Sequence, residues 1–126
     1  MPYAFAMQRF TELEVWRRSH QFALATYRLT ATLPRSEQFG IVAQLRRAAV
    51  SVSANIAEGA KRLSSKDYER FLNIAEGSLA ECQCLLLLSR DLGFAPPESA
   101  AALLGQAAAI ALKLHRLRDR VHRAHS

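Results

Sequence analysis

Glycine, proline and cysteine are scarce in this sequence: its 126 residues include 5 glycines, 4 prolines and 2 cysteines. Few helix breakers, together with many Ala, Leu and Arg residues, favour an all-α protein. A chain of this length is expected to form a single domain, residues 1–126. Cys82 and Cys84 would point to nearly opposite sides of a helix, so they should share neither a disulfide nor a metal ion. The two free thiols, with no targeting or membrane-spanning segment in the sequence, predict a cytoplasmic protein that does not associate with membranes.

Recognisable catalytic motifs are also missing. The sequence contains no P-loop, no HExxH, no GxSxG and no paired CxxC. Glu58, Glu81 and Arg47 are expected to form a buried polar network rather than an acid–base site, because no nucleophile or metal motif accompanies them. His115 and His122 share a helix face seven residues apart, and a solvated basic face explains them better than a metal site. We therefore predict a protein that is not an enzyme, with no cofactor and no bound metal.

Apolar residues recur at the period of an α-helix in four segments of the chain, residues 12–33, 36–59, 65–92 and 97–122. Ser64 with Asp67 three residues later resembles a capping box at the start of the third segment. Gly59 suits the left-handed position just after the second helix, and Pro97 suits the first turn of the fourth. Short connections between long helices predict an up-down-up-down antiparallel four-helix bundle.

The second predicted helix has almost no solvated face. Between residues 38 and 60 the only charged side chains are Arg46, Arg47 and Glu58. A helix that is small or apolar all round is packed on more than one side, so this one should touch its own bundle on one face and something else on the other. In the third helix Gly77 costs about 1 kcal/mol relative to Ala, and we expect close approach to a neighbouring helix as the compensation.

The first predicted helix carries two apolar stripes. The stripe assigned to the core consists of Leu13, Trp16, His20, Ala23, Leu24, Tyr27 and Ala31. The second consists of Val15, Phe22 and Leu29, spaced by seven residues. A row of three apolar residues on an outer face indicates a contact surface. We therefore predict that Val15, Phe22 and Leu29 form an oligomer interface.

Positive charge is concentrated in part of the chain. In a bundle of this topology residues 1–18, 54–70 and 113–126 lie at one end, and they include twelve basic and six acidic residues, which accounts for the whole net charge of +6. Such polarity favours a nucleic-acid ligand. No RNA-recognition motif is present, so RNA or DNA should be bound through phosphates without strong sequence preference. The predicted contact residues are Lys61, Arg62, Lys66, Arg70, Lys113, Arg116, Arg120 and Arg123.

Three stretches of the sequence resemble a known family: residues 10–16 (FTELEVW), 44–59 (QLRRAAVSVSANIAEG) and 71–81 (FLNIAEGSLAE). They are similar to the four-helix bundle family of ribosomal-RNA intervening-sequence proteins, and the resemblance spans residues 10–93. The positions that carry the motif are Arg46, Arg47, Ser51, Asn55, Glu58, Gly59, Gly77, Ser78 and Glu81, and the family does not make them catalytic.

The resemblance implies a cytoplasmic homo-oligomer, typically a pentameric ring. It also implies kinship to the basic accessory protein of diversity-generating retroelements, which binds nucleic acid and a reverse transcriptase. Nucleic-acid binding therefore has an alternative, a protein-interaction scaffold or accessory subunit, for example of a reverse transcriptase, whose basic end meets an acidic partner.

Overall fold

The chain folds into four long α-helices and two short 3₁₀ turns. The computed structural model describes residues 9–125, so positions 1–8 and 126 of the predicted domain lie outside the described residues. The elements in chain order are η1 (Phe10–Glu12), α2 (Glu14–Thr30), η2 (Arg35–Glu37), α3 (Ile41–Ala60), α4 (Ser65–Asp91) and α5 (Pro97–Ala124). Residues 9–125 contain no β-strand, and the prediction of an all-α protein is confirmed.

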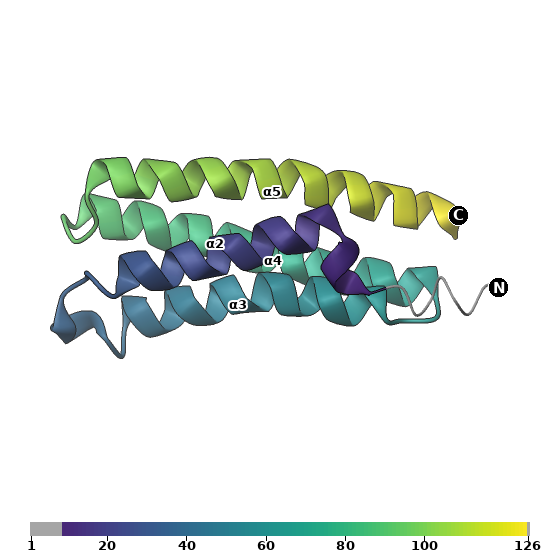
Figure 1. Cartoon of the computed structure of the whole chain (residues 1–126), viewed down its shortest axis with the longest axis horizontal. Helices are drawn as coiled ribbons and strands as arrows, with labels where there is room; N and C mark the ends of the chain where they lie inside the picture. Colours follow the sequence, from purple (N-terminus) through teal and green to yellow (C-terminus); the bar gives the residue numbers. More distant parts are fainter. Residues whose placement is uncertain (1–8, 126) are drawn as a thin grey trace.

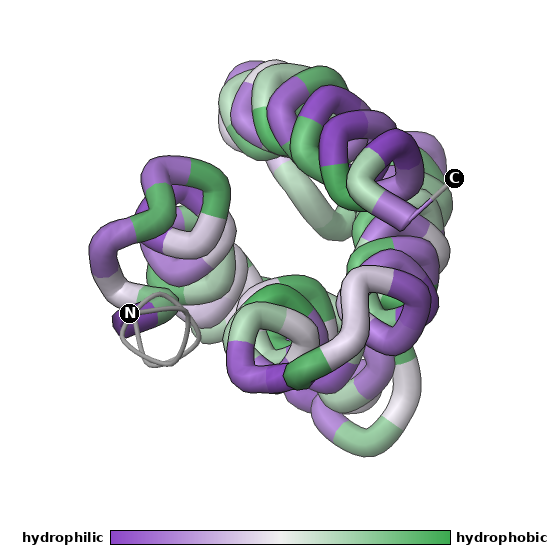
Figure 2. The backbone as a smooth tube through the Cα atoms, turned by 90° about the vertical axis from the view of Figure 1, so that its right-hand side faces the viewer, coloured by the Kyte–Doolittle hydropathy of each residue, from purple (hydrophilic) through white to green (hydrophobic). Residues whose placement is uncertain are grey.

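Successive helices run in opposite directions along one axis (Figure 1). Each helix packs against two others, so that α2, α3, α4 and α5 surround a shared core, as the end-on view in Figure 2 shows. The contact between α2 and α5 is the least extensive of the four. A surface groove of about 510 Å³ lies along it, lined by Glu14, Arg17, Arg18, Gln21, Gln106 and Ile110.

The apolar stripes predicted for the last three helices point inward. In α3, Leu45, Val52 and Ile56 are completely buried. The inner faces of α4 and α5 contribute Leu72, Ala75, Leu79, Cys82, Leu86, Leu103, Ala107, Ile110 and Leu114 to the same cluster. For these helices the periodicity of the sequence identified the buried face correctly.

For α2 the prediction is reversed in part: Leu13, Trp16 and Ala23 of the stripe assigned to the core do pack against the core, but the second stripe does so as well. Val15, Phe22 and Leu29 were expected on an outer surface, but only 5%, 0% and 8% of these residues is exposed, and all three belong to the core. Leu24 and Tyr27, from the stripe assigned to the core, are exposed. These three residues therefore hold the bundle together and are not available as an oligomer interface.

Three hydroxyl residues explain the reversal. Ser19, Thr26 and Thr30 are buried on the same face as Phe22. Each donates its hydroxyl to the carbonyl oxygen four residues earlier in α2, at 2.8 Å. A hydroxyl satisfied by its own helix needs no partner elsewhere and is tolerated in a core. The inner face of α2 therefore contains polar residue types that a simple apolar pattern leaves out.

His20 also differs from its predicted place in the core. It is exposed and stacks on the half-buried ring of Trp16, with the ring centroids 4.9 Å apart. Trp16 in turn meets the edge of Phe10 from η1. The first 3₁₀ turn, η1, contacts α3 as well as α2.

The helix ends confirm some predictions and correct others. The backbone N–H of Asp67 donates to Ser64 Oγ at 3.0 Å, which caps α4 as predicted, and Pro97 lies in the first turn of α5. Residues 12 and 36 were expected to begin helices, but short 3₁₀ turns occupy these regions, so α2 begins at Glu14 and α3 at Ile41. The left-handed glycine among residues 9–125 is Gly93, after α4.

Two glycines have roles opposite to those predicted. Gly59 does not follow α3 but is buried inside its last turn, where an added Cβ would lie 2.9 Å from Phe71 Cβ and 2.9 Å from Tyr68 Cδ1. Gly77 is exposed, and an added Cβ there would meet no atom of another helix within 4 Å among residues 9–125. Gly59, rather than Gly77, permits the close approach between helices within the bundle.

We expect Gly59→Ala and Gly77→Ala to change stability in opposite directions. The first forces α3 away from Phe71, and such overpacking costs about 1–3 kcal/mol. The second replaces an exposed helix glycine and should stabilise the helix by about 0.5–1 kcal/mol. Urea unfolding of both variants at one chain concentration measures the difference. A Gly59→Ala variant as stable as the parent would contradict the packing described here.

One described helix, α4, is long and apolar enough to cross a membrane by length and composition alone. The core helix of a helical bundle has the same two properties. Here α4 packs against α3 on one side and α5 on the other.

Candidate nucleic-acid interface

Segments that are far apart in the sequence come together at one end of the bundle. The start of α2, the α3–α4 connection at residues 61–64 and the last turns of α5 all lie toward the end that holds the C-terminus (Figure 1). Figure 2 looks onto this end, where hydrophilic residues dominate the last turns of α5. The topology therefore gathers the basic segments that the sequence predicted to share one end.

On the α3–α4 side, two predicted contact residues enclose an aromatic ring. The guanidinium groups of Arg62 and Arg70 lie 4.6 and 4.5 Å from the ring centroid of Phe71. Arg70 also donates to Asp67 Oδ1 at 2.9 and 3.1 Å, and Arg62 lies 3.9 Å from the other carboxylate oxygen. Asp67 therefore positions both arginines and compensates part of their charge.

On the α2–α5 side, one carboxylate forms ion pairs with two basic side chains. Glu14 accepts a hydrogen bond from Arg18 at 3.1 Å and lies 3.4 Å from Lys113 Nζ. The hydrogen bond from Arg18, and then the contact with Lys113, lower the pKa of the Glu14 carboxyl, which keeps it ionised. Arg116 and Arg120 are exposed and line, with Lys113, a hollow of about 230 Å³.

A second and larger hollow, of about 590 Å³, lies between α4 and α5. Its basic lining residues are Lys66, Arg70 and Arg118. Arg118 pairs with Glu76 across the two helices, and this hydrogen bond raises the pKa of the guanidinium further. The lining of the hollow therefore combines the exposed, unpaired cation of Lys66 with arginines held by carboxylates.

The structure divides the predicted contact residues between two sides of the basic end. Lys66 and Arg70 border the α4–α5 hollow, whereas Lys113, Arg116 and Arg120 border the α2–α5 hollow. Arg123 pairs with Asp119 on its own helix at 3.2 Å. Among the described residues, four of the eight predicted contact residues are exposed or half-buried without a salt bridge: Lys61, Lys66, Arg116 and Arg120. The predicted contact residues do not include Arg118, which also lines the α4–α5 hollow. Its place there can be recognised only when the register of α4 against α5 is known.

Several motif residues turn out to join helices. Arg46 donates to Thr30 Oγ1 at 2.8 Å and lies over the ring of Tyr27, which ties α3 to α2. The hydroxyls of Ser51 and Ser78 are 2.8 Å apart and link α3 to α4. Asn55 supports this link from within α3, because its amide donates to the Ser51 hydroxyl at 3.0 Å. At Gly59 the backbone of α3 comes so close to Phe71 of α4 that an added Cβ would lie 2.9 Å from Phe71 Cβ.

The remaining motif residues do not form the predicted buried network. Arg47, Glu58 and Glu81 are all exposed, as is Gly77. Burial raises the pKa of the neighbouring Cys82 thiol to about 12, so it stays protonated and unreactive. None of these residues forms an acid–base or nucleophilic arrangement in the part of the chain that the structure describes.

The fold and the charged end define a small, basic, all-helical bundle protein. The chain belongs to the family of 23S rRNA-intervening sequence proteins, which residues 11–116 match. The resemblance drawn from the sequence is thereby confirmed. A crystal structure of a protein with unknown function, from the S23 ribosomal protein family of Bacteroides thetaiotaomicron, is similar at 25% sequence identity with a TM-score of 0.78. The match covers 82% of this chain and 97% of that one. No curated protein sequence matches the chain.

Proposed function

We propose that this chain is a non-enzymatic protein that binds RNA or DNA through phosphates, without strong sequence preference. The observation that carries the proposal is the surplus of positive charge at one end of the bundle. Lys61, Lys66, Arg116 and Arg120 project there with no carboxylate partner among residues 9–125. Cations already paired within the protein gain less from a phosphate than these four do.

The lack of sequence preference follows from the side chains at this end. Among the described residues the exposed Phe, Tyr and Trp side chains are Tyr27 and Phe39. Both belong to the other half of the bundle, near the α2–α3 connection. Sequence-specific readers of single-stranded RNA stack bases on exposed aromatic rings, whereas phosphate contacts carry no sequence information.

We expect binding that weakens steeply with salt. On single strands the slope of log K against log salt is about −0.7 per phosphate contact, so four contacts predict roughly a 50-fold loss between 50 and 200 mM salt. Fluorescence anisotropy with labelled oligouridylate and oligoadenylate measures both the slope and the sequence preference. No binding at low salt would refute the proposal and favour an acidic protein as the partner of the basic end, in a scaffold or accessory subunit.

We also propose that the chain forms a homo-oligomer, with the backs of α3 and α4 as the interface. Val50 on α3 and Leu87 and Leu88 on α4 are exposed large apolar residues. Gly77, Ala80 and Cys84 are small exposed residues on the outer side of α4, where the exposed Glu81 is the charged neighbour. An apolar surface of this kind is typical of protein–protein contacts. Five copies in a ring is what the family resemblance implies.

Leu88→Glu should dissociate the oligomer while leaving the helices folded. The substitution places a charge in the proposed interface, where it has no partner. Size-exclusion chromatography with light scattering measures the mass, and Leu112→Glu on the outer side of α5 is the matched control. A parent that runs as a 14.0 kDa monomer at micromolar concentration would exclude the oligomer.

A further inference from the structure

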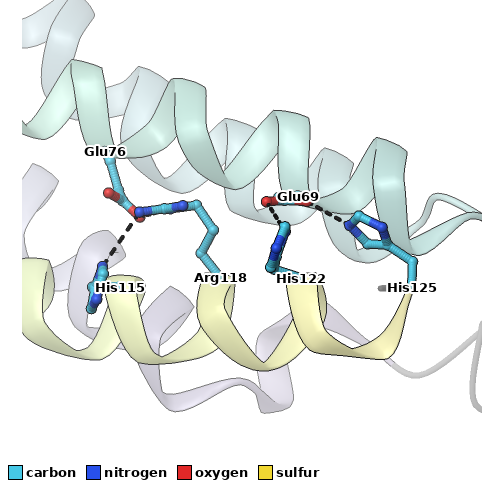
Figure 3. Close-up of polar contacts among 6 residues, drawn as sticks. All are labelled: Glu69, Glu76, His115, Arg118, His122 and His125. Carbon is cyan, nitrogen blue, oxygen red and sulfur yellow. Dashed lines mark hydrogen bonds and ion pairs between the residues drawn. The ribbon is translucent and has the colours of Figure 1, made fainter.

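Three side chains that can bind a metal converge where the start of α4 faces the end of α5 (Figure 3). Glu69 Oε1 lies 2.8 Å from His122 Nδ1, and Glu69 Oε2 lies 2.6 Å from His125 Nε2. One candidate ligand atom from each of the three residues lies within 4.8 Å of the other two. We propose that Glu69, His122 and His125 form a binding site for a divalent transition metal ion of the Zn²⁺ type.

The donor set fits this chemistry. Two imidazole nitrogens and one carboxylate oxygen are ligands that Zn²⁺ accepts, and three protein ligands leave one of its four positions open to water. Bonds of about 2.0–2.2 Å place tetrahedral ligands roughly 3.3 Å apart. In the structure these atoms lie within 4.8 Å of one another, so binding requires the side chains to move closer together. The two imidazole–carboxylate hydrogen bonds are then exchanged for bonds to the ion, and the imidazole protons that faced Glu69 are released to solvent.

The backbone already holds the three residues in place. His122 lies in the last turn of α5, and His125 is the C-cap residue directly after Ala124, where the helix ends. Glu69 faces them from the second turn of α4, a helix that packs along α5. The side chain of His122 is 53% exposed, and those of His125 and Glu69 are 26% and 22% exposed. An ion can therefore reach the ligands without unfolding the helix ends.

The positive charge at this end opposes a cation, and Lys66, which lines the same hollow as Glu69, has no salt bridge among the described residues. The neighbouring arginines, in contrast, are compensated. Arg118 pairs with Glu76, Arg70 with Asp67 and Arg123 with Asp119. The last turn of α5 adds carbonyl dipoles that favour a positive ion.

A bound ion would cross-link α4 to the last turn of α5, independently of any nucleic acid. The test uses the untagged full-length chain, with isothermal titration of Zn²⁺ and thermal melts in EDTA and in excess Zn²⁺. We expect one ion per chain and a melting temperature raised by about 5 °C or more at a hundredfold excess over Kd. His122→Ala, and separately Glu69→Gln, should each weaken binding by about tenfold or more.

Two matched controls separate this site from other ligands. His115 is an exposed histidine on α5 outside the cluster, and His20 is an exposed histidine on α2. His115→Ala and His20→Ala should keep the parental affinity within about twofold, because neither residue belongs to the cluster of Glu69, His122 and His125. His125→Gln serves as a further ligand variant if the metal-free melt shows that His122→Ala is misfolded. The proposal is wrong if the parent binds no Zn²⁺, if folded ligand variants bind as the parent does, or if either control loses as much affinity as the ligand variants.

Discussion

Phe22→Ala should lower the free energy of unfolding by about 3–5 kcal/mol, the usual range for truncating a buried phenylalanine. Phe22 has no exposed surface and lies in the middle of the core face of α2. The truncation removes a full aromatic ring from the space between helices and leaves a cavity that neighbouring side chains fill only in part. Urea unfolding monitored by circular dichroism, at one fixed chain concentration, measures the loss.

Phe39→Ala is the matched control for this truncation. Phe39 is 92% exposed, so the same change of side chain there should alter stability by less than about 0.5 kcal/mol. The pair also tests which face of α2 points inward. If Phe22 instead lay on an outer oligomer surface, its truncation would change the mass of the assembly and leave the unfolding of the chain nearly unaffected.

Arg116→Glu combined with Arg120→Glu should weaken nucleic-acid binding by about tenfold or more at low salt. Both side chains are exposed on α5 and make no salt bridge among the described residues, so their reversal breaks no ion pair there. The loss should be similar for all sequences, and the salt slope should become shallower by about 0.7 for each phosphate contact removed. Anisotropy titrations at several salt concentrations give both quantities.

Arg28→Glu combined with Arg35→Glu is the control for net charge. These arginines are also exposed, lie at the opposite end of the bundle and change the charge by the same amount. The control should retain most of the parental affinity, because exposed charges farther apart than the Debye length, about 10 Å, are largely screened at 0.1 M salt. Equal losses in the two variants would mean that overall charge, and not the basic end, governs binding.

The sequence predicted α3, α4 and α5 well because their buried faces consist of apolar residues at helical spacing. It failed for α2 because Ser19, Thr26 and Thr30 are buried while bonded to their own helix. A pattern of apolar residues alone then selects the wrong face. Gly59 was misassigned because a glycine near a helix end usually indicates a cap. Here the glycine is needed for close packing against Phe71, a contact with another helix that the sequence does not show.

Only the net positive charge of the candidate site could be predicted from the sequence. The sequence indicated which segments would share one end, since that follows from the topology. Which cations are compensated depends on contacts between helices, such as Arg118 with Glu76 and Lys113 with Glu14. The spacing of His122 and His125 is visible in the sequence. Glu69, however, lies on α4, 53 residues before His122, and the sequence does not show how α4 is aligned along α5.

The arrangement of contacts around the bundle has a consequence for how the chain folds. Three of the four helix–helix contacts join neighbours in the sequence, whereas α2 meets α5 across almost the whole chain. Closing that contact costs the most loop entropy, and it is also the least extensive. We therefore expect α3, α4 and α5 to form first as a local unit that α2 completes. In native-state hydrogen exchange the amides of α2 should exchange through an opening of lower free energy than the amides of α3 and α4. Helix α2 is then the part of the bundle that unfolds first while α3, α4 and α5 stay packed.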